Sequence, residues 1–479
     1  MHLSVRLTGV AALAVLLAPP SSAQHPAVPP TTWAITGARI EPASGPVIDK
    51  GTIVIRNGLI AAVGADVRAP ADARIVDGDG LTVYPGLIDA SSSLGMPSRG
   101  GGGGGGGGFG GGGGGATQTP TRTGALNSNY AVGMQAEMRA ATELEPAANA
   151  FKAAHGAGFT AALTAQSSGI FRGTSAVITL RDAPVPALIV RDGVAQHIGF
   201  SRGGGGGYPG SLMGVFAQLR QELLDAQHYR DLKAAYARSP RGMNRPDHDP
   251  TLEALQPVLA GTIPVVMAAN SEREITRALD LAKEFGIKPI IAGGREAYKV
   301  TDRLRAENVM VLLDIDFPRR TAPTGGRADT SVTPEPERMD VLRDRVELPK
   351  SPGKLAGAGV RFVIASGNDY TNFLANARHA VEAGLDPLRA LKAMTIDPAT
   401  LFGVGDRLGS IEVGKIANLT ITKGGLFADS TKVTQLFVDG NQIEVSSAVT
   451  PAAGAADTPR RGAPGNDSQT ERTDASHDH

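Results

Sequence analysis

Short apolar runs with alternating polar positions dominate the first part of the chain. Trp33–Ile40, Gly51–Arg56, Leu59–Val63 and Ala73–Val76 each have the length and alternation typical of a β-strand. Asn57-Gly58 separates two of these runs, and this dipeptide favours a two-residue hairpin turn because both central residues need positive φ. Four short strands are therefore expected before the longer middle part of the chain begins.

Similar strand patterns return near the other end. Ile411–Ile421 and Val433–Val445 are strand-rich, and Asp439-Gly440 supplies a second hairpin dipeptide. We expect these runs to complete the β subdomain that begins at Trp33.

Helical and strand patterns alternate through the middle of the chain. This alternation predicts an α/β fold in which a parallel sheet is wound with helices and closes into a barrel. Asp386 and Pro387 have the residue types of an N-cap and a first helical position. The expected helices are Gln135–His155, Ser211–Leu232, Thr251–Leu259, Glu272–Phe285, Arg295–Glu307, Asn372–Ala383 and Pro387–Asp397, and the expected strands are Phe159–Thr164, Ile263–Ala268, Lys288–Ala292, Val309–Ile315 and Val360–Ala365.

The two ends of the chain have a composition unlike that of a packed domain. Met1–Ala23 joins a basic start at Arg6 to an apolar run and a small-residue cleavage site, which predicts a secretory signal peptide. The apolar run is too short to span a bilayer, and no later run reaches that length. A Pro-rich linker at residues 24–31 follows, and residues 447–479 form an Ala/Pro/Gly/Asp-rich tail expected to be disordered.

Two glycine tracts interrupt the middle of the chain, at Gly100–Gly115 and Gly203–Gly207. Neither has the Lys and Ser/Thr that follow a phosphate-binding loop, so they predict inserted flexible loops. The expected organisation is a first β part at residues 32–84, a barrel at 85–404 and a second β part at 405–446.

Composition excludes several classes of function. The 47 basic and 47 acidic residues cancel, which argues against nucleic acid as a partner. The chain has no cysteine, so disulfides, thiolate nucleophiles and thiolate metal sites are excluded. A cysteine-free exported chain suits an oxidising compartment, and we expect a periplasmic or secreted protein.

Leu81–Gly95 reads LTVYPGLIDASSSLG and carries the most informative pattern. A short strand enters Pro85-Gly86, and a second strand delivers Asp89 and three serines to its carboxyl end, where catalytic groups of barrels lie. The stretch resembles the amidohydrolase superfamily, in particular imidazolonepropionase-like periplasmic members, whose pattern here is Pro-Gly-Leu-Ile-Asp-Ala followed by His-x-His. Residues Gly359–Gly414 resemble the same family. The resemblance implies a (β/α)8 TIM-like barrel with a small β-sandwich subdomain built from both termini.

The resemblance also implies zinc or another divalent metal, and this chain departs from the pattern at the metal ligands. Ser91 and Ser93 occupy the two histidine places. A neutral hydroxyl is a poor zinc ligand, so we expect these serines to orient substrate and not to bind metal. The family's later histidine places fall on Ala268 and on Gly293-Gly294. No cofactor is therefore expected, and no metal ligands are assigned.

The family's aspartate after the last barrel strand falls on Asn368 or Asp369, and a slip of one residue decides between them. If Asp369 occupies the place, one carboxylate remains for general acid–base catalysis. We assign Asp369 the catalytic role and Asn368, with the serines, a role in binding substrate.

The nine histidines offer no replacement ligand set. His2 and His25 belong to the signal peptide and linker, and the tail's His477-x-His479 lacks a supporting pocket. The patterns place His155, His228 and His379 in helices and His197 after a strand. His248 lies between Asp247 and Asp249 in a loop, where loose metal binding stays open.

Several functions remain open. The first is a degenerate amidohydrolase that binds a small amide- or peptide-like ligand or associates with an intact relative. The alternative is an active hydrolase of amide-type C–N bonds with a reduced site centred on Asp369. Two further readings are a serine nucleophile among Ser91–Ser93, which lacks a neighbouring base, and an envelope-associated interaction protein.

Overall fold

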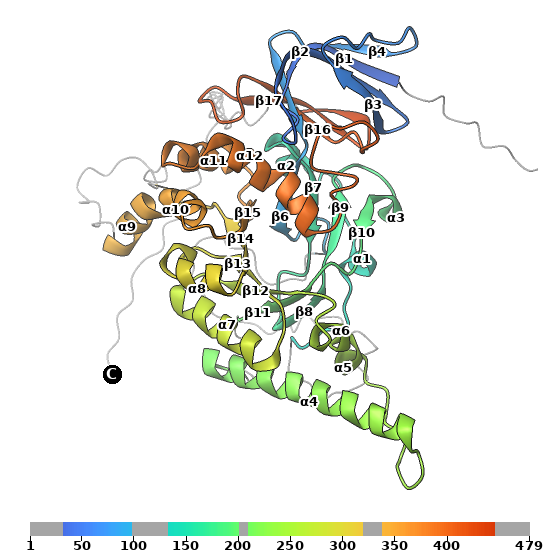
Figure 1. The fold of residues 1–479 in the computed structure, drawn as a ribbon, viewed down its shortest axis with the longest axis vertical. Helices are drawn as coiled ribbons and strands as arrows, with labels where there is room; N and C mark the ends of the chain where they lie inside the picture. The colour runs from blue at the N-terminus through green and yellow to red at the C-terminus, as the bar shows by residue number, and fades with distance from the viewer. Residues whose placement is uncertain (1–31, 98–132, 201–208, 320–337, 446–479) are drawn as a thin grey trace, which may run out of the picture. The chain divides into compact units, whose positions relative to one another are not determined.

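The computed structural model describes residues 32–97, 133–200, 209–319 and 338–445, all within one unit, Met1–Val445 (Figure 1). The expected signal peptide, linker, glycine tracts and tail lie outside these described residues, so their predictions stay untested. None of the described helices combines the length and the apolarity needed to cross a membrane.

Strands from both ends of the described chain share one sheet of eight strands. Its order is β18-β17-β16-β5-β1-β2-β3, and β4 pairs with β1. The early strand β5 pairs antiparallel with the late strand β16, which joins the blue and orange parts of Figure 1. The ladder is continuous, whereas the expected sandwich has two sheets. The strands are β1 (Thr32–Ile40), β2 (Ile48–Arg56), β3 (Leu59–Gly64), β4 (Arg74–Asp77), β5 (Leu81–Pro85), β16 (Leu419–Lys423), β17 (Lys432–Val438) and β18 (Asn441–Glu444).

Both predicted hairpins are confirmed. Asn57 and Gly58 connect β2 to β3 with φ of 52° and 80°. Asp439 and Gly440 connect β17 to β18 with φ of 50° and 73°. Positive φ at both central residues is the geometry that the twist of paired strands requires.

Two further sheets form the α/β part. One has the order β10-β9-β7-β6, and the other has the order β15-β14-β13-β12-β11-β8. β6 and β7 are parallel, as are β11 to β15, while β8 and β9 pair antiparallel with their neighbours. No ladder joins the two sheets within the described residues. The strands are β6 (Leu87–Ser92), β7 (Phe159–Thr164), β8 (Phe171–Thr174), β9 (Ala176–Thr179), β10 (Ile189–Arg191), β11 (Gln196–Gly199), β12 (Val265–Ala269), β13 (Pro289–Gly293), β14 (Met310–Asp314) and β15 (Phe362–Ala365).

Successive residues of these strands enter two different hydrophobic clusters. On β14, Val311 and Leu313 belong to the cluster shared with the helices, whereas Leu312 belongs to a second cluster. The second cluster contains residues of both sheets, including Ile88 of β6 and Val363 of β15. The two sheets therefore enclose a common interior, and we call the side that carries this second cluster the inner face.

The helices connect these strands. α7 begins with a capping box of Ser271 and Glu274 and ends at Gly286, whose φ is 65°. Asp386 caps α12 as predicted. The helices are α1 (Ala140–Glu143), α2 (Lys152–Gly156), α3 (Val185–Leu188), α4 (Leu212–Arg238), α5 (Pro250–Ala254), α6 (Gln256–Leu259), α7 (Glu272–Phe285), α8 (Thr301–Ala306), α9 (Met339–Glu347), α10 (Ser351–Gly357), α11 (Phe373–Glu382), α12 (Pro387–Met394) and α13 (Ile396–Leu401), with 3-10 turns at Ala297–Lys299 and Leu348–Lys350.

Several helix predictions were wrong in extent, and those over 251–259 and 387–397 each cover parts of two helices. The expected helix over 135–155 is two short helices, α1 and α2, separated by an irregular segment that contains Pro146. Proline lacks the N–H that a helix interior requires, so a continuous helix is interrupted there. The expected helix from Arg295 begins as the 3-10 turn at Ala297 and becomes α-helical only at Thr301.

Candidate functional site at the strand ends

The signature strand β6 ends in the three serines. Ser91 and Ser93 are partly exposed, whereas Ser92 is buried and donates to the Leu163 carbonyl at 3.1 Å. The structure therefore leaves the hydroxyls of Ser91 and Ser93 at the strand end, where the sequence assigns them to substrate.

Asp89, just before these serines, is the centre of a buried hydrogen-bond network. Its side chain is fully buried, and its Oδ2 accepts from the Ser366 hydroxyl at 2.6 Å and the Tyr370 hydroxyl at 2.8 Å. Its Oδ1 accepts from the Ser366 amide at 3.0 Å and the Ser91 amide at 3.3 Å. Burial raises the pKa of the Asp89 carboxyl above its ordinary value, and these hydrogen bonds oppose the shift. Asp89 thus joins β6 to the segment after β15.

The predicted acid, Asp369, has a different environment. Both of its carboxylate oxygens accept from the Asn372 side-chain amide, at 2.9 and 2.8 Å, and one also accepts from the Asn372 backbone amide at 3.2 Å. Asn368 is exposed with φ of 65°, and its amide donates to the Ser366 hydroxyl. The carboxylate of Asp369 is therefore directed toward the residue before α11, and Ser366 and Tyr370 are the residues of this segment that contact Asp89.

The sequence analysis expects the family's later histidine places at Ala268 and Gly293, and the structure shows why a side chain does not fit at Gly293. Gly293 ends β13 with φ of 90°, and a Cβ there would lie 2.4 Å from Oδ1 of Asn270. Any side chain at Gly293 would be strained and would displace Asn270. Ala268 lies on β12, opposite Ala292 of β13.

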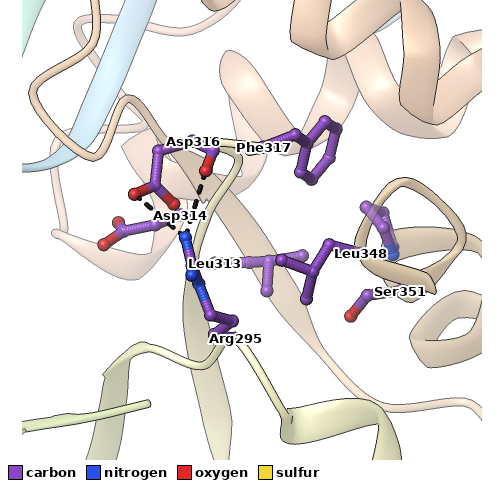
Figure 2. A pocket seen from close by; sticks show the side chains of 8 residues that line it. Arg295, Leu313, Asp314, Asp316, Phe317, Leu348 and Ser351 are labelled. Carbon is purple, nitrogen blue, oxygen red and sulfur yellow. Dashed lines mark hydrogen bonds and ion pairs between the residues drawn. The ribbon is translucent and has the colours of Figure 1, made fainter. Parts of the chain in front are cut away.

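A second acid, which the sequence analysis missed, ends β14. Asp314 has a buried Oδ1 without a hydrogen-bond partner among the described residues. Figure 2 shows its carboxylate beside Arg295, whose guanidinium donates to the Asp316 carbonyl at 3.2 Å and to its carboxylate at 3.5 Å. Burial, then the nearby carboxylates of Asp316 and Asp89, raise the pKa of Asp314 to about 7, and Arg295 opposes this. The position of Asp314 at a strand end was the only available sequence signal.

The cavity beside this cluster is small. It has a volume of about 10 Å³ and is also lined by Phe317, Leu348 and Ser351 (Figure 2). Such a space holds about one water molecule. The cavity is therefore too small for a substrate.

The side chains at the strand ends do not fit the metal centre that the family resemblance implies. Within the described ranges, no three His, Cys, Asp or Glu side chains lie close enough to hold a metal ion. His197 lies within β11, not after it as expected, and its Nε2 has no partner in the described part of the chain. In the loop of His248, the Asp249 carboxylate instead caps α5 by accepting from the Thr251 and Leu252 amides. We derive no chemistry through a metal.

The comparisons with known sequences match parts of the chain. The sequence model of the amidohydrolase family matches residues 345–445. An adenine deaminase of Moorella thermoacetica is 36% identical over 66 residues, which is 14% of this chain and 11% of that protein. An adenine deaminase of Roseobacter denitrificans is 49% identical over 45 residues, 9% of this chain and 8% of that protein. The matches thus span about a tenth of the length of these curated relatives.

The fold comparison extends over most of the chain. The crystal structure of an amidohydrolase from Thermotoga maritima superposes with a TM-score of 0.68 at 24% identity, covering 86% of this chain and 99% of that one. The C-terminal side of the chain is therefore similar to the amidohydrolase family, and the chain shares the fold of the Thermotoga maritima protein over most of its length.

Proposed function

We propose that this chain is an exported member of the amidohydrolase superfamily that binds a small amide- or peptide-like ligand at the strand ends without a two-metal centre. The observation that carries the proposal is the set of side chains present there. By the family resemblance, Ser91, Ser93, Ala268 and Gly293 occupy the places of the histidines; a hydroxyl is a poor zinc ligand, and a methyl group or a hydrogen atom cannot bind metal.

The intact scaffold supports a binding role. Asp89 is held by four donors, so the carboxyl ends of β6 and β15 are fixed relative to each other although the metal ligands have changed. A rigid set of strand ends is what a ligand site requires. We also propose that the protein acts in the periplasm or outside the cell, alone or as a subunit with an intact amidohydrolase.

Metal content is the direct test of this proposal. We expect elemental mass spectrometry of the purified mature protein, loaded with zinc and then dialysed, to find much less than one equivalent of metal. A matched variant with Ser91→His and Ser93→His controls for the assay by restoring two imidazoles. About two equivalents of tightly held metal in the natural protein, as in two-metal hydrolases, would contradict the proposal.

A second candidate function is hydrolysis of an amide-type C–N bond, and the local similarity to adenine deaminases favours it. In this alternative Asp369 acts as the general acid–base group, while Ser91, Ser93 and Asn368 orient substrate or water.

The change Asp369→Ala tests this alternative. We expect it to lower the free energy of unfolding by about 1 kcal/mol, because the Asn372 amides lose their acceptor. We also expect any C–N hydrolase activity of the protein to survive the change. Measurement of adenine and amide hydrolysis in parallel with urea unfolding separates the two effects, and an abolished activity with normal folding would restore Asp369 as catalytic.

A further inference from the structure

A β-bulge sets Arg172 of β8 opposite His197 of β11. Gln196 pairs with Thr174 and Ile198 pairs with Phe171. Between these two pairs, Arg172 and Gly173 on β8 lie opposite the single residue His197 on β11. Gly173 has φ of 80°, and a Cβ there would lie 2.2 Å from the Met138 carbonyl oxygen, so only glycine fits the bulge. Bulges change the direction of a side chain and are common next to functional sites.

The register of the neighbouring strands shows where this pair lies. His197 pairs with Val266, and Gly199 pairs with Ala268. Val266 belongs to the inner cluster, so His197 and Gly199 face the interior that the two sheets share. A Cβ on Gly199 would lie only 2.0 Å from Nη2 of Arg172. The guanidinium therefore lies over Gly199 on the inner face.

Among the residues that the structure describes, the guanidinium of Arg172 has no counter-ion. The Nε of Arg172 donates to the Gly169 carbonyl at 3.1 Å, and no carboxylate of the described ranges forms an ion pair with the guanidinium. Burial lowers the pKa of Arg172, but a guanidinium stays protonated in proteins. Arg172 is partly buried, and a guanidinium held in this position without a carboxylate partner among the described residues is suited to bind an anion.

His197 is the second group of the site. Its side chain is 7% exposed, and its Nε2 has no partner among the described residues. Burial and, after it, the charge of Arg172 lower the pKa of His197 to about 3, so the imidazole is neutral at pH 7. It adds a hydrogen bond to a ligand but no second charge.

We propose that Arg172 and His197 form a subsite for the carboxylate of a small ligand on the inner face. A planar guanidinium binds a carboxylate with two parallel hydrogen bonds. One positive charge matches a carboxylate, whereas a phosphate ester carries up to two negative charges and needs a second cation. The subsite deepens the proposed function because it specifies a ligand with a free carboxyl group.

The test compares acids with their amides on the full mature protein. N-acetylglycine and glycylglycine are titrated beside N-acetylglycinamide and glycylglycinamide by calorimetry and thermal unfolding, up to about 50 mM, where a site of millimolar Kd fills. We expect each acid to bind about 10- to 100-fold more tightly than its amide, as charge-assisted hydrogen bonds predict.

Two variants locate the effect. Arg172→Met should abolish the preference for the acid, whereas Arg220→Met, which removes an exposed arginine paired with Glu284, should leave it unchanged. Gly199→Ala keeps the charge but forces the guanidinium out of its position, so it should weaken acid binding about 10-fold. Gly156→Ala is its control, because a Cβ there meets no atom within 4 Å.

The outcomes are distinct from those of the metal test. A natural protein that binds no acid, or an Arg172→Met protein that keeps the preference, overturns the subsite while a metal-free result still stands. If the protein holds metal tightly and its preference for acids over amides depends on Arg172, the subsite stands and only the proposal of a function without a two-metal centre is overturned.

Discussion

Replacing Asp89 with alanine is expected to lower the free energy of unfolding by about 3 kcal/mol or more. The change leaves the hydroxyls of Ser366 and Tyr370 and the amides of Ser366 and Ser91 without their shared acceptor in a buried site. Each buried donor that loses its partner costs about 1 to 3 kcal/mol. Urea unfolding monitored by circular dichroism measures the loss.

Two further variants show whether the network is responsible. Asp89→Asn keeps the shape and one acceptor oxygen, so we expect about half of the loss seen with alanine. Ser91→Ala removes a partly exposed hydroxyl that makes no hydrogen bond among the described residues, and it should change stability by less than about 0.5 kcal/mol. An Asp89→Ala protein as stable as the Ser91→Ala protein would show that the network does not stabilise the fold.

Replacing Glu222 with glutamine is expected to stabilise the protein at neutral and alkaline pH. Glu222 lies on the long helix α4 (Figure 1), its side chain is 1% exposed, and its Oε1 has no partner in the described part of the chain. Burial, followed by the charges of Asp225, Asp249 and Glu137, raises the pKa of Glu222 from 4.5 to about 8. The folded protein therefore retains a proton that the unfolded chain loses.

The direction of the pH dependence follows from this difference. An acid whose pKa rises on folding stabilises the protein fully below its ordinary pKa, and this stabilisation is lost as the pH rises toward the pKa of the folded state. Natural protein and Glu222→Gln should have similar stability near pH 4. Above pH 8 the variant should be more stable by about 2 to 4 kcal/mol.

The measurement is the midpoint of urea unfolding from pH 4 to pH 9. Asp231→Asn, on the exposed side of the same helix, is the matched control because Asp231 is exposed and forms a surface ion pair with its neighbour Arg230. Its curve should run parallel to that of the natural protein. If the midpoints of Glu222→Gln also ran parallel to those of the natural protein across this pH range, the raised pKa of buried Glu222 would be contradicted.

The sequence pattern correctly predicted turns, helix caps and helix bounds that depend only on residues close together in the chain. The Asn57-Gly58 and Asp439-Gly440 turns, the Asp386 cap and the bounds of helix α7 follow from the conformations and hydrogen bonds of neighbouring residues. The expected helix over 135–155 is interrupted because Pro146, between α1 and α2, lacks the N–H that a helix interior requires. Element order also indicated the α/β class.

Only part of the candidate site could be predicted in the same way. The signature placed Ser91 and Ser93 at the end of a strand, and they lie at the end of β6. It did not show that the partners of Asp89 come from Ser366 and Tyr370, 277 and 281 residues away. It also assigned the free acid to Asp369, whose oxygens the structure pairs with Asn372.

The sequence by itself determined the family resemblance, the prediction that serine, alanine and glycine stand at the family's histidine places, and the local turns and caps, because each depends on residue identity or on neighbours in the chain. Tertiary structure alone decided which charges are buried and which of them meet. Asp314 is an ordinary strand-end aspartate until Asp316 and Asp89 lie near it, and Arg172 is an ordinary arginine until a bulge places it over Gly199. The cost of a buried charge depends on the water it loses and the partners it gains, and both are set by strands distant in the sequence.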